Sequence, residues 1–279
     1  MIIMLHIGWF STARGNSSRI LLNSVVEKIK TNQLDAQIDF VFCSREPGEY
    51  ETTDLFIRQV RDYKIPLICF SIKKFAQASG QQVGAKDGNL PGWRLEYDRQ
   101  VMDKLKDFDC KLCLLAGYML IAGPEMCRRY NMINLHPALP DGPKGTWQEV
   151  IRQLIKENAA ESGVMMHLVT PELDRGPVIS FCRYPIQGPA FDPLWAATGN
   201  RPLDEIEAQS GQENELFKLI RQNGFEREIP LILHTLRAFS SGKILISGNT
   251  LLDEQKTPIA GYDLTAEIER ELKNINPVN

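Results

Sequence analysis

The chain has 279 residues, of which 43% are hydrophobic and 24% charged, so a sizeable core is possible and a disordered tail or a fibre is excluded. The charge is close to balance, because 32 Lys and Arg residues stand against 35 Asp and Glu residues. Without a basic field over the whole sequence, nucleic acid and anionic lipid are not expected as main partners.

The first ten residues, MIIMLHIGWF, are strongly apolar. They contain neither a basic leader nor a small-residue cleavage site, and the run is too short to cross a bilayer, so we expect neither a secretion signal nor a membrane anchor. The six cysteines mostly lie within apolar runs, where a free thiol behaves as a small buried hydrophobic group. These features predict a cytoplasmic protein with a buried first strand.

Cys110 and Cys113 form a C-x-x-C pair. No second pair of Cys or His follows at the spacing of a zinc site, and side-chain alternation along a strand would place the two thiols on opposite faces. We therefore expect no metal site.

Apolar runs rich in Ile, Val, Leu and Phe alternate along the chain with segments of helical periodicity. The predicted strands are residues 2–7, 38–43, 65–70, 112–116, 132–135, 164–169 and 178–184. The predicted helices are residues 17–30, 54–63, 95–106 and 146–157, with a longer one over 213–241 that is kinked or restarted near Gly224 and Pro230. Continuous apolar strands joined by crossover helices are typical of an α/β fold with a mostly parallel, doubly wound, Rossmann-like sheet.

Two segments rich in glycine and proline, residues 79–93 and 185–211, interrupt the alternation. We predict that both are long surface loops. A short strand pair is expected later in the chain, around Ile244 and Leu251.

A short polar loop, S-T-A-R-G-N-S-S over residues 11–18, lies between the first predicted strand and the first predicted helix. At such a helix N-terminus, free backbone N–H groups and the helix dipole can hold an anion such as a phosphate. The loop has the spacing of neither G-x-G-x-x-G nor G-x-x-x-x-G-K-[ST], so it does not indicate a dinucleotide or a nucleoside triphosphate. An ordinary helix N-terminus without a ligand is the other interpretation of the same residues.

Asn134 and His136 lie two positions apart at the end of a predicted strand, within Asn-Leu-His-Pro. Side chains two apart along a strand point the same way, and ligands bind at the carboxyl ends of strands in open α/β sheets. An amide can stabilise a developing oxyanion, and an imidazole can exchange a proton with a nucleophile. A histidine that only caps a turn is the alternative.

A carboxylate follows in the polar turn T-P-E-L-D-R-G-P, over residues 170–177 between two later strands. This turn is expected to place Asp174 on the same rim as His136. A carboxylate near an imidazole stabilises the imidazolium and fixes its orientation, which keeps the ring useful as an acid or base near neutral pH. The pattern alone also fits a plain turn, and His167, on the preceding strand, is expected to be a structural residue.

The chain resembles the folate-dependent formyltransferase family through four blocks in order. The blocks are residues 11–18, L-A-G-Y-M at 115–119, N-L-H-P at 134–137 and V-T-P-E-L-D-R-G-P-V at 169–178, with a weaker match at Glu228 and at P-I-A-G-Y over 258–262. Within the family it is most similar to the branch that formylates glycinamide ribonucleotide in purine biosynthesis. The resemblance implies the formyltransferase fold as a single domain over 1–279, with a phosphate-binding half (1–118) and a folate and catalytic half (119–279).

The resemblance also implies a role for each matched position. A formyl group would pass from N10 of 10-formyltetrahydrofolate to an amine, with Asn134, His136 and Asp174 as the catalytic residues. Met119, Leu120 and Ile121 would border the pterin pocket, Arg14, Gly15, Asn16 and Ser17 would hold the substrate phosphate, and Glu228 would hold ribose hydroxyls. The implied partners are small molecules, without nucleic acid, membrane or metal, and the implied enzyme is a monomer or a homodimer.

Several positions depart from the family pattern. Leu120 stands where a basic residue is usual, Met165 stands where a small hydroxyl residue is usual, and the segment after His136 and Pro137 is one residue short. Because these changes surround the expected substrate and folate contacts, another small amine, such as an amino sugar nucleotide, is an alternative acceptor. A non-catalytic folate- or nucleotide-binding relative is a second alternative. Methionyl-tRNA formylation and formyl-folate hydrolysis are disfavoured, since the chain offers little room for the additional domains of those enzymes.

Overall fold

The computed structural model describes residues 4–83, 90–110, 112–198 and 214–275. The chain forms two compact units that interleave along the sequence. Unit 1 comprises residues 1–135, 167–177 and 235–259, and unit 2 comprises residues 136–166, 178–234 and 260–279. A single domain over 1–279, with halves that meet at residue 118, stays a prediction.

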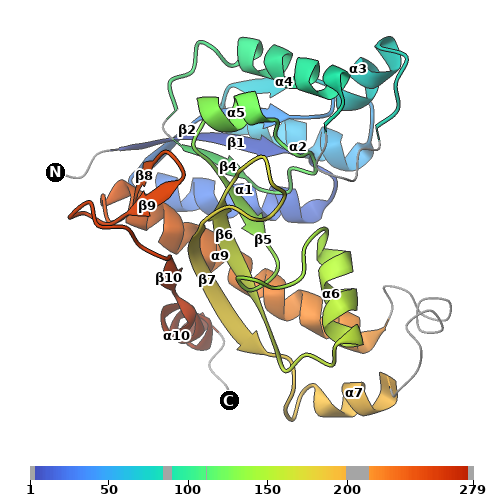
Figure 1. Cartoon of the computed structure of the whole chain (residues 1–279), viewed down its shortest axis with the longest axis vertical. Coiled ribbons are helices and arrows are strands. Elements are labelled where there is room, and N and C mark those ends of the chain that lie inside the picture. Colours follow the sequence, from blue (N-terminus) through green and yellow to red (C-terminus); the bar gives the residue numbers. More distant parts are fainter. Residues whose placement is uncertain (1–3, 84–89, 111, 199–213, 276–279) are drawn as a thin grey trace. The chain divides into compact units, whose positions relative to one another are not determined.

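Unit 1 contains five parallel strands in the order β5-β4-β1-β2-β3 (Figure 1). They are β1 (Leu5–Ser11), β2 (Ala36–Cys43), β3 (Leu67–Cys69), β4 (Leu112–Leu115) and β5 (Met132–His136). The helices between them are α1 (Asn16–Lys30), α2 (Glu51–Asp62), α3 (Ile72–Ala78), α4 (Gly92–Lys104) and α5 (Pro124–Arg129). In Figure 1, α4 and α5 lie on one side of these strands and α1 on the other, so helices cover both faces, as in a doubly wound fold.

Aromatic rings fill much of the core of unit 1. Phe40 and Phe42 lie two apart on β2, so alternation sends both to the same face, where Phe10 of β1 contacts them with ring centroids 5.7 and 5.3 Å away. Gly8 makes this packing possible, because a Cβ atom at that position would lie 2.5 Å from the ring of Phe40. The phenyl ring of Phe10 also meets Tyr118 edge to face.

Unit 2 contains β6 (Glu161–Leu168), β7 (Val178–Pro185) and β10 (Tyr262–Asp263), in the order β10-β7-β6. Its helices are α6 (Trp147–Lys156), α7 (Asp192–Thr198), α9 (Glu215–Ser240, whose last turns belong to unit 1) and α10 (Thr265–Ile275). A capping box starts α6: the Thr146 hydroxyl accepts from the Glu149 N–H, and the Glu149 carboxylate accepts from the Thr146 N–H. Apolar side chains of α6 and α9, including Val150 and Phe217, share one buried cluster.

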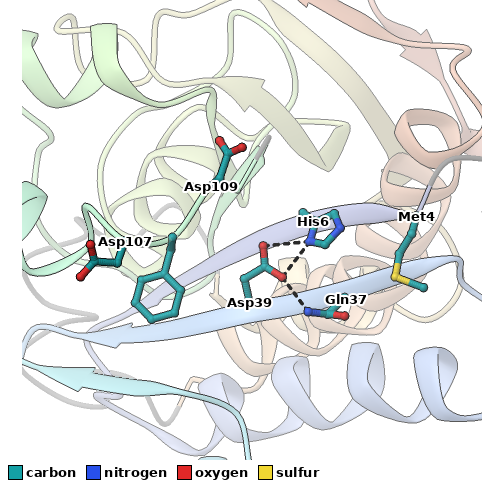
Figure 2. Close-up of a pocket in the computed structure, with 7 residues that line it drawn as sticks. Met4, His6, Gln37, Asp39, Asp107 and Asp109 are labelled. Carbon is teal, nitrogen blue, oxygen red and sulfur yellow. Dashed lines mark hydrogen bonds and ion pairs between the residues drawn. The ribbon is translucent and has the colours of Figure 1, made fainter.

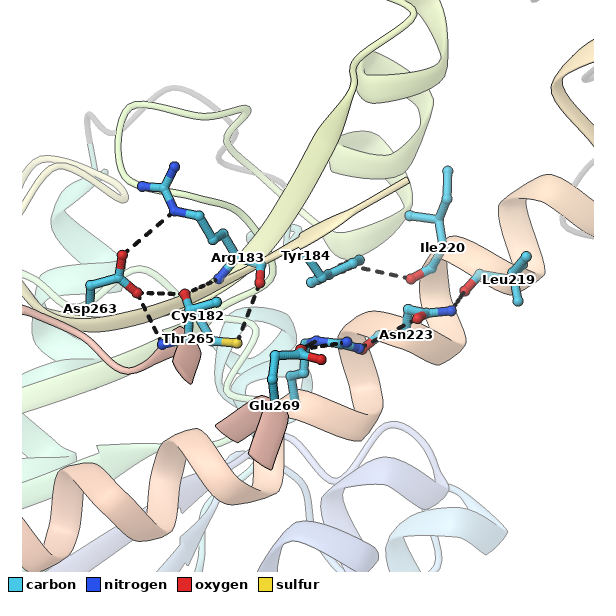
Figure 3. A network of polar contacts seen from close by, with 10 residues as sticks. Cys182, Arg183, Tyr184, Leu219, Ile220, Asn223, Asp263, Thr265 and Glu269 are labelled. Carbon is cyan, nitrogen blue, oxygen red and sulfur yellow. Dashed lines mark hydrogen bonds and ion pairs between the residues drawn. The ribbon is translucent and has the colours of Figure 1, made fainter. Parts of the chain in front are cut away.

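Polar contacts hold α10 against α9 and β7 (Figure 3). Arg227 of α9 is buried, and its Nε donates to the Glu269 carboxylate of α10 at 2.7 Å. The same guanidinium lies over the ring of Tyr184 on β7, 4.5 Å from its centroid. At the start of α10, the Thr265 hydroxyl accepts from the Arg183 N–H at 3.0 Å. These contacts fix a C-terminal helix that the sequence patterns did not predict.

All seven predicted strands occur, with shifted ends. The largest shift is at the first strand, which was expected at 2–7 and spans Leu5–Ser11; residues 2 and 3 lie outside the described part of the chain. The short antiparallel pair β8 (Leu245–Ser247) and β9 (Thr250–Leu252) confirms the strand pair expected around Ile244 and Leu251. Within the described part of the chain, no helix is long and apolar enough to cross a membrane.

Several expectations about local structure need correction. The long helix is not restarted, since α9 runs through Gly224 and Pro230 as one element, and the kink expected as the alternative stays a prediction. Of the two segments expected as long loops, 185–211 contains the helix α7, and 79–93 ends in the first two residues of α4. Residues 84–89 and 199–211 of these segments lie outside the described part of the chain. The thiols of Cys110 and Cys113 do not point to opposite faces, because Cys110 precedes β4 and its Sγ lies 3.4 Å from that of Cys113.

Candidate active site

The order of the strands in unit 1 reverses at β1, because the chain adds β2 and β3 on one side of β1 and then β4 and β5 on the other. In open α/β sheets, ligands bind at the carboxyl ends of the strands beside such a switch point. Two segments follow these ends here, residues 12–15 after β1 and 116–123 after β4. Thr12 joins them: its N–H donates to the Gly117 carbonyl, and its hydroxyl accepts from the Met119 N–H, both at 2.9 Å.

The segment after β1 ends in a helix N-terminus without a side-chain cap. Gly15 is the N-cap residue of α1, and no side chain hydrogen-bonds to the first turn from that position. Ala13 has a φ of 51°, held by its N–H, which donates to Ser11 Oγ at 3.0 Å, and by the Thr53 hydroxyl, which donates to the Ala13 carbonyl at 3.1 Å. Arg14 is exposed beside this turn. Uncapped N–H groups, the helix dipole and a nearby cation together suit an anion.

A buried ion pair on α4 anchors the segment after β4. Arg94 and Asp98, 4% and 1% exposed, pair with each other across one helical turn. Arg94 also donates to the Ile121 carbonyl, and Asp98 accepts from the Gly123 N–H, both at 2.7 Å. Burial raises the pKa of the Asp98 carboxyl, while the guanidinium of Arg94 opposes that shift. Hydrogen bonds with two buried charged side chains thus fix the backbone at Ile121 and Gly123.

The three residues expected at a pterin pocket differ in exposure. Met119 is 48% exposed, whereas Leu120 is partly buried against the aromatic core of unit 1 and Ile121 is half-buried. Of these three residues, Met119 therefore offers the largest exposed apolar side chain, of the kind that packs against a flat ring.

Asn134 and Asp174 both approach one nitrogen of His167. The Asn134 amide Nδ2 lies 3.1 Å from His167 Nε2, and Asp174 Oδ1 lies 3.6 Å from the same nitrogen. The other ring nitrogen, Nδ1, lies 3.0 Å from the Leu168 carbonyl, which can only accept, so Nδ1 carries the proton and Nε2 accepts from the amide in the neutral ring. The side chains of His167 and Asp174 are 3% and 7% exposed. An amide and a carboxylate that lie 40 residues apart in sequence thus meet around one buried imidazole.

The turn that carries Asp174 has a fixed course. Asp174 adopts a φ of 49°, in the left-handed region. Gly176 follows, and a Cβ atom there would lie 1.7 Å from the Leu168 carbonyl oxygen, so no side chain fits. The Leu168 N–H donates to the Pro177 carbonyl at 2.9 Å, which closes the turn. The close approach of the backbone, rather than the acidic side chain, explains why this turn needs a glycine.

Replacing His167 with Ala is expected to destabilise the protein by about 1–3 kcal/mol, since the half-buried Asn134 amide loses its acceptor and a buried ring is removed. Urea unfolding of both proteins measures this difference. His6→Ala is the matched control, because His6 contacts Asp39 with a side chain that is 40% exposed, against 3% for His167. A cost for His167→Ala as small as that of the control would contradict the structural importance of the imidazole.

His136 belongs to unit 2 and is the last residue of β5. Its ring is buried, and Nε2 lies 2.9 Å from the Pro143 carbonyl. Because a carbonyl only accepts, Nε2 carries a proton. The ring is therefore oriented by the backbone of the following loop.

Glu228 lies on α9 in unit 2 and is buried. Its carboxylate Oε1 accepts a short hydrogen bond from Arg221, two helical turns earlier. Burial raises the pKa of Glu228, and Arg221 opposes that shift. The guanidinium of Arg221 also lies over the rings of Trp147 and Phe225, each centroid 5.0 Å away. The carboxylate that the resemblance assigns to ribose hydroxyls is thus already paired within unit 2.

The structure brings together part of the expected site. Asn134 and Asp174 meet at His167, and the segments with Arg14 and Met119 are linked through Thr12. His167 was expected to be a structural residue, and its contacts with two candidate catalytic residues were not predicted. The sequence indicated only that His167 lies on the same face of its strand as Met165 and Val169. Among the residues with described coordinates, no three His, Cys, Asp or Glu side chains group as a metal site would require.

Comparison with known proteins identifies the family. The formyl transferase family model matches residues 15–188. Phosphoribosylglycinamide formyltransferase of Escherichia coli (strain K12) is 27% identical over 251 residues, which cover 89% of this chain and 94% of the relative.

Two solved structures share the fold. Phosphoribosylglycinamide formyltransferase from Coxiella burnetii, in complex with CHES, has a TM-score of 0.65 and 18% identity over 94% of this chain and 99% of its own. A formyltetrahydrofolate deformylase from Pseudomonas syringae pv. tomato str. DC3000 has a TM-score of 0.60 and 18% identity over 90% of this chain and 66% of its own.

These likenesses confirm the predicted α/β formyltransferase fold. The family model covers more than half of the sequence. The chain therefore belongs to the formyl transferase family.

Proposed function

We propose that this chain transfers a formyl group from 10-formyltetrahydrofolate to the amine of glycinamide ribonucleotide. The observation that carries the proposal is the meeting of Asn134 and Asp174 at the buried ring of His167. Asn134 lies on β5, the strand whose last residue is His136. The name of the Escherichia coli relative supports the same acceptor. The proposal includes a cytoplasmic enzyme that acts on small molecules, without nucleic acid, as a monomer or homodimer.

In the proposed reaction, the amine attacks the formyl carbon and the carbonyl oxygen becomes an oxyanion. The Asn134 amide has two N–H bonds, of which one is directed to His167 Nε2, and the proposal assigns the other to the oxyanion. The bond from the formyl carbon to N10 then breaks, while the amine loses a proton and N10 gains one. A positioned amide donor of this kind typically contributes about 10²- to 10³-fold to kcat.

We assign the proton transfers to His136 and Asp174. The His136 ring, oriented by the hydrogen bond from its Nε2 to the Pro143 carbonyl, would gain and lose the proton. The imidazolium would also stabilise the oxyanion, and the Asp174 carboxylate would favour the charged ring and relay protons through water. His167 is then a positioning residue, because it acts through Asn134 and Asp174.

The phosphate of the acceptor is assigned to the first turn of α1. Gly15, Asn16 and Ser17 would offer backbone N–H groups at the uncapped end of the helix, and Arg14 would add a positive charge. The ribose hydroxyls are assigned to Glu228, whose Oε2 would accept while Oε1 is held by Arg221. The pterin ring is assigned to Met119, Leu120 and Ile121, over the backbone that Arg94 and Asp98 hold.

Arg14→Ala is expected to raise KM for the phosphorylated amine about tenfold, with kcat nearly unchanged, because the lost contact is the same in the ground and transition states. Steady-state kinetics at saturating folate measures both constants. The matched control is Arg19→Ala, since Arg19 is on the same helix but donates to Gln59. Equal KM values for the two variants would remove Arg14 from the phosphate site.

The acceptor is tested by comparing kcat/KM for glycinamide ribonucleotide with that for amino sugar nucleotides, using the same 10-formyltetrahydrofolate. The proposal requires the first value to be higher by at least about 10²-fold, the discrimination that a site built to hydrogen-bond its substrate can provide. One observation favours the other acceptor, namely that Leu120, where a basic residue is usual in the family, packs against the core. Folate binding without turnover of any amine would instead identify a non-catalytic relative.

A further inference from the structure

Cys110 and Cys113 form a close dithiol just before and within the first half of β4, whereas the proposed site follows the carboxyl ends of the strands. Their Sγ atoms lie 3.4 Å apart. Cys113 is fully buried on β4, whereas Cys110 is partly exposed at the amino end of that strand. Cys110 is therefore the more exposed cysteine of the pair, and Cys113 is the buried one.

The neighbouring strand holds the buried thiol in place. A Cβ atom on Gly8 of β1 would lie 3.0 Å from Cys113 Sγ, so the glycine leaves room for the sulfur. The hydrogen bond with the Cys113 thiol, and a smaller one with the Gly8 backbone, lower the pKa of Cys110, although burial and the Asp39 carboxylate oppose that shift. Burial raises the pKa of Cys113. This asymmetry is typical of a C-x-x-C pair with a reactive outer cysteine.

An open pocket lies against the two residues that precede Cys110, although neither cysteine lines it (Figure 2). Phe108 and Asp109, which directly precede Cys110, line the pocket together with Asp39 and Asp107, and its volume is about 660 Å³. Figure 2 shows the Asp39 carboxylate directed to His6, with an Nδ1 to Oδ1 distance of 2.9 Å. Three carboxylates thus surround an opening large enough for a small molecule, and they favour a cationic one.

We propose that Cys110 and Cys113 are a reversible redox site that is oxidised by a small cationic disulfide entering through this pocket. The Cys110 thiolate attacks one sulfur of the reagent, its S–S bond breaks, and one thiolate leaves. Cys113 then attacks the Cys110 sulfur of the mixed disulfide and releases the second thiolate. The protein loses two electrons and two protons, and the reagent becomes two thiols.

The required movement is small. A disulfide has an S–S length of about 2.05 Å, so the sulfurs must approach by roughly 1.3 Å. Cys110 lies outside the regular part of β4, and a change there does not require the strand to move. The inference concerns residues that take no part in the proposed formyl transfer, so it can fail or succeed independently of that function.

The test uses the reduced full-length protein, with cystamine as the cationic disulfide and glutathione disulfide as the anionic one. We expect cystamine to remove two hydrogens from the protein mass, with the new cross-link mapped to Cys110 and Cys113 by peptide analysis, and dithiothreitol to restore the original mass. Cystamine should react about tenfold faster than glutathione disulfide at low ionic strength, and added salt should reduce that ratio. A cross-link between other cysteines would contradict the proposed redox site. Equal reaction rates for cystamine and glutathione disulfide would contradict the entry of the reagent through this pocket.

Two variants separate the roles of the sulfurs. Cys113→Ala should accumulate the mixed disulfide on Cys110, and iodoacetamide should alkylate its Cys110 about tenfold more slowly near pH 7, because the stabilising thiol is lost. Cys127→Ala, which removes another partly buried cysteine, is the control and should oxidise like the parent protein. Unchanged alkylation of Cys110 in Cys113→Ala would contradict the pairing, and the peptide map of the parent protein decides the proposal even if that variant fails to fold.

Discussion

His136→Ala is expected to lower kcat by about 10²- to 10⁴-fold, because it removes both a general acid–base group and a donor to the oxyanion. The KM values for the two substrates should change little, since the imidazole is assigned to the reacting atoms and not to the phosphate or the pterin. Steady-state formation of the formylated amine, followed at saturating substrate, measures the loss.

His234→Ala is the matched control for this variant, because His234 also belongs to unit 2 and also has a polar partner, Glu271, at 3.0 Å. Its kcat should stay close to that of the parent protein. If His136→Ala retained most of its kcat while remaining folded, the assignment of His136 to proton transfer would be wrong.

The second large effect is expected for Asp174→Asn, which should lower kcat by about 10²-fold. The substitution keeps the size of the side chain, and Asn tolerates the left-handed conformation that Asp174 adopts, so the turn should survive. What is lost is the negative charge that would stabilise an imidazolium. Activity assays and urea unfolding of the same preparation separate catalysis from stability.

Asp141→Asn provides a control with the same chemical change. Asp141 also has a positive φ, 63°, but its side chain is exposed. This variant should keep the activity of the parent protein. A loss of kcat in Asp174→Asn no greater than in Asp141→Asn would show that the carboxylate has no part in the reaction.

The strands could be predicted because each is an apolar run, but their ends could not. The first ten residues are apolar almost throughout, so hydropathy alone does not show where pairing begins. The partner strand decides it, since Leu5 pairs with Ala36 and Ser11 with Cys43. Helix α10 was missed for another reason: five of its eleven residues are charged. Ile268, Leu272 and Ile275 do recur at helical spacing, and Ile268 is fully buried.

The candidate site, too, could be predicted only in part from the sequence. Asn134 and His136 could be paired from the sequence, because alternation along one strand is a local property. The contact of Asn134 with His167 could not, because it depends on the pairing of two segments about 33 residues apart. The Val169 N–H donates to the Met132 carbonyl at 2.8 Å, and this register brings His167 beside Asn134. The register between these two segments cannot be predicted from the residue types alone.

The central claim is that Asn134, His136 and Asp174 act on one formyl group. It is tested most directly by a crystal structure of the protein with a folate analogue that carries a formyl-like group and with glycinamide ribonucleotide. The account predicts that the Asn134 amide and the His136 ring lie within about 3.2 Å of the reacting atoms, and that Asp174 reaches them directly or through one water. A structure in which either His136 or Asp174 lies too far away for such a contact would contradict it.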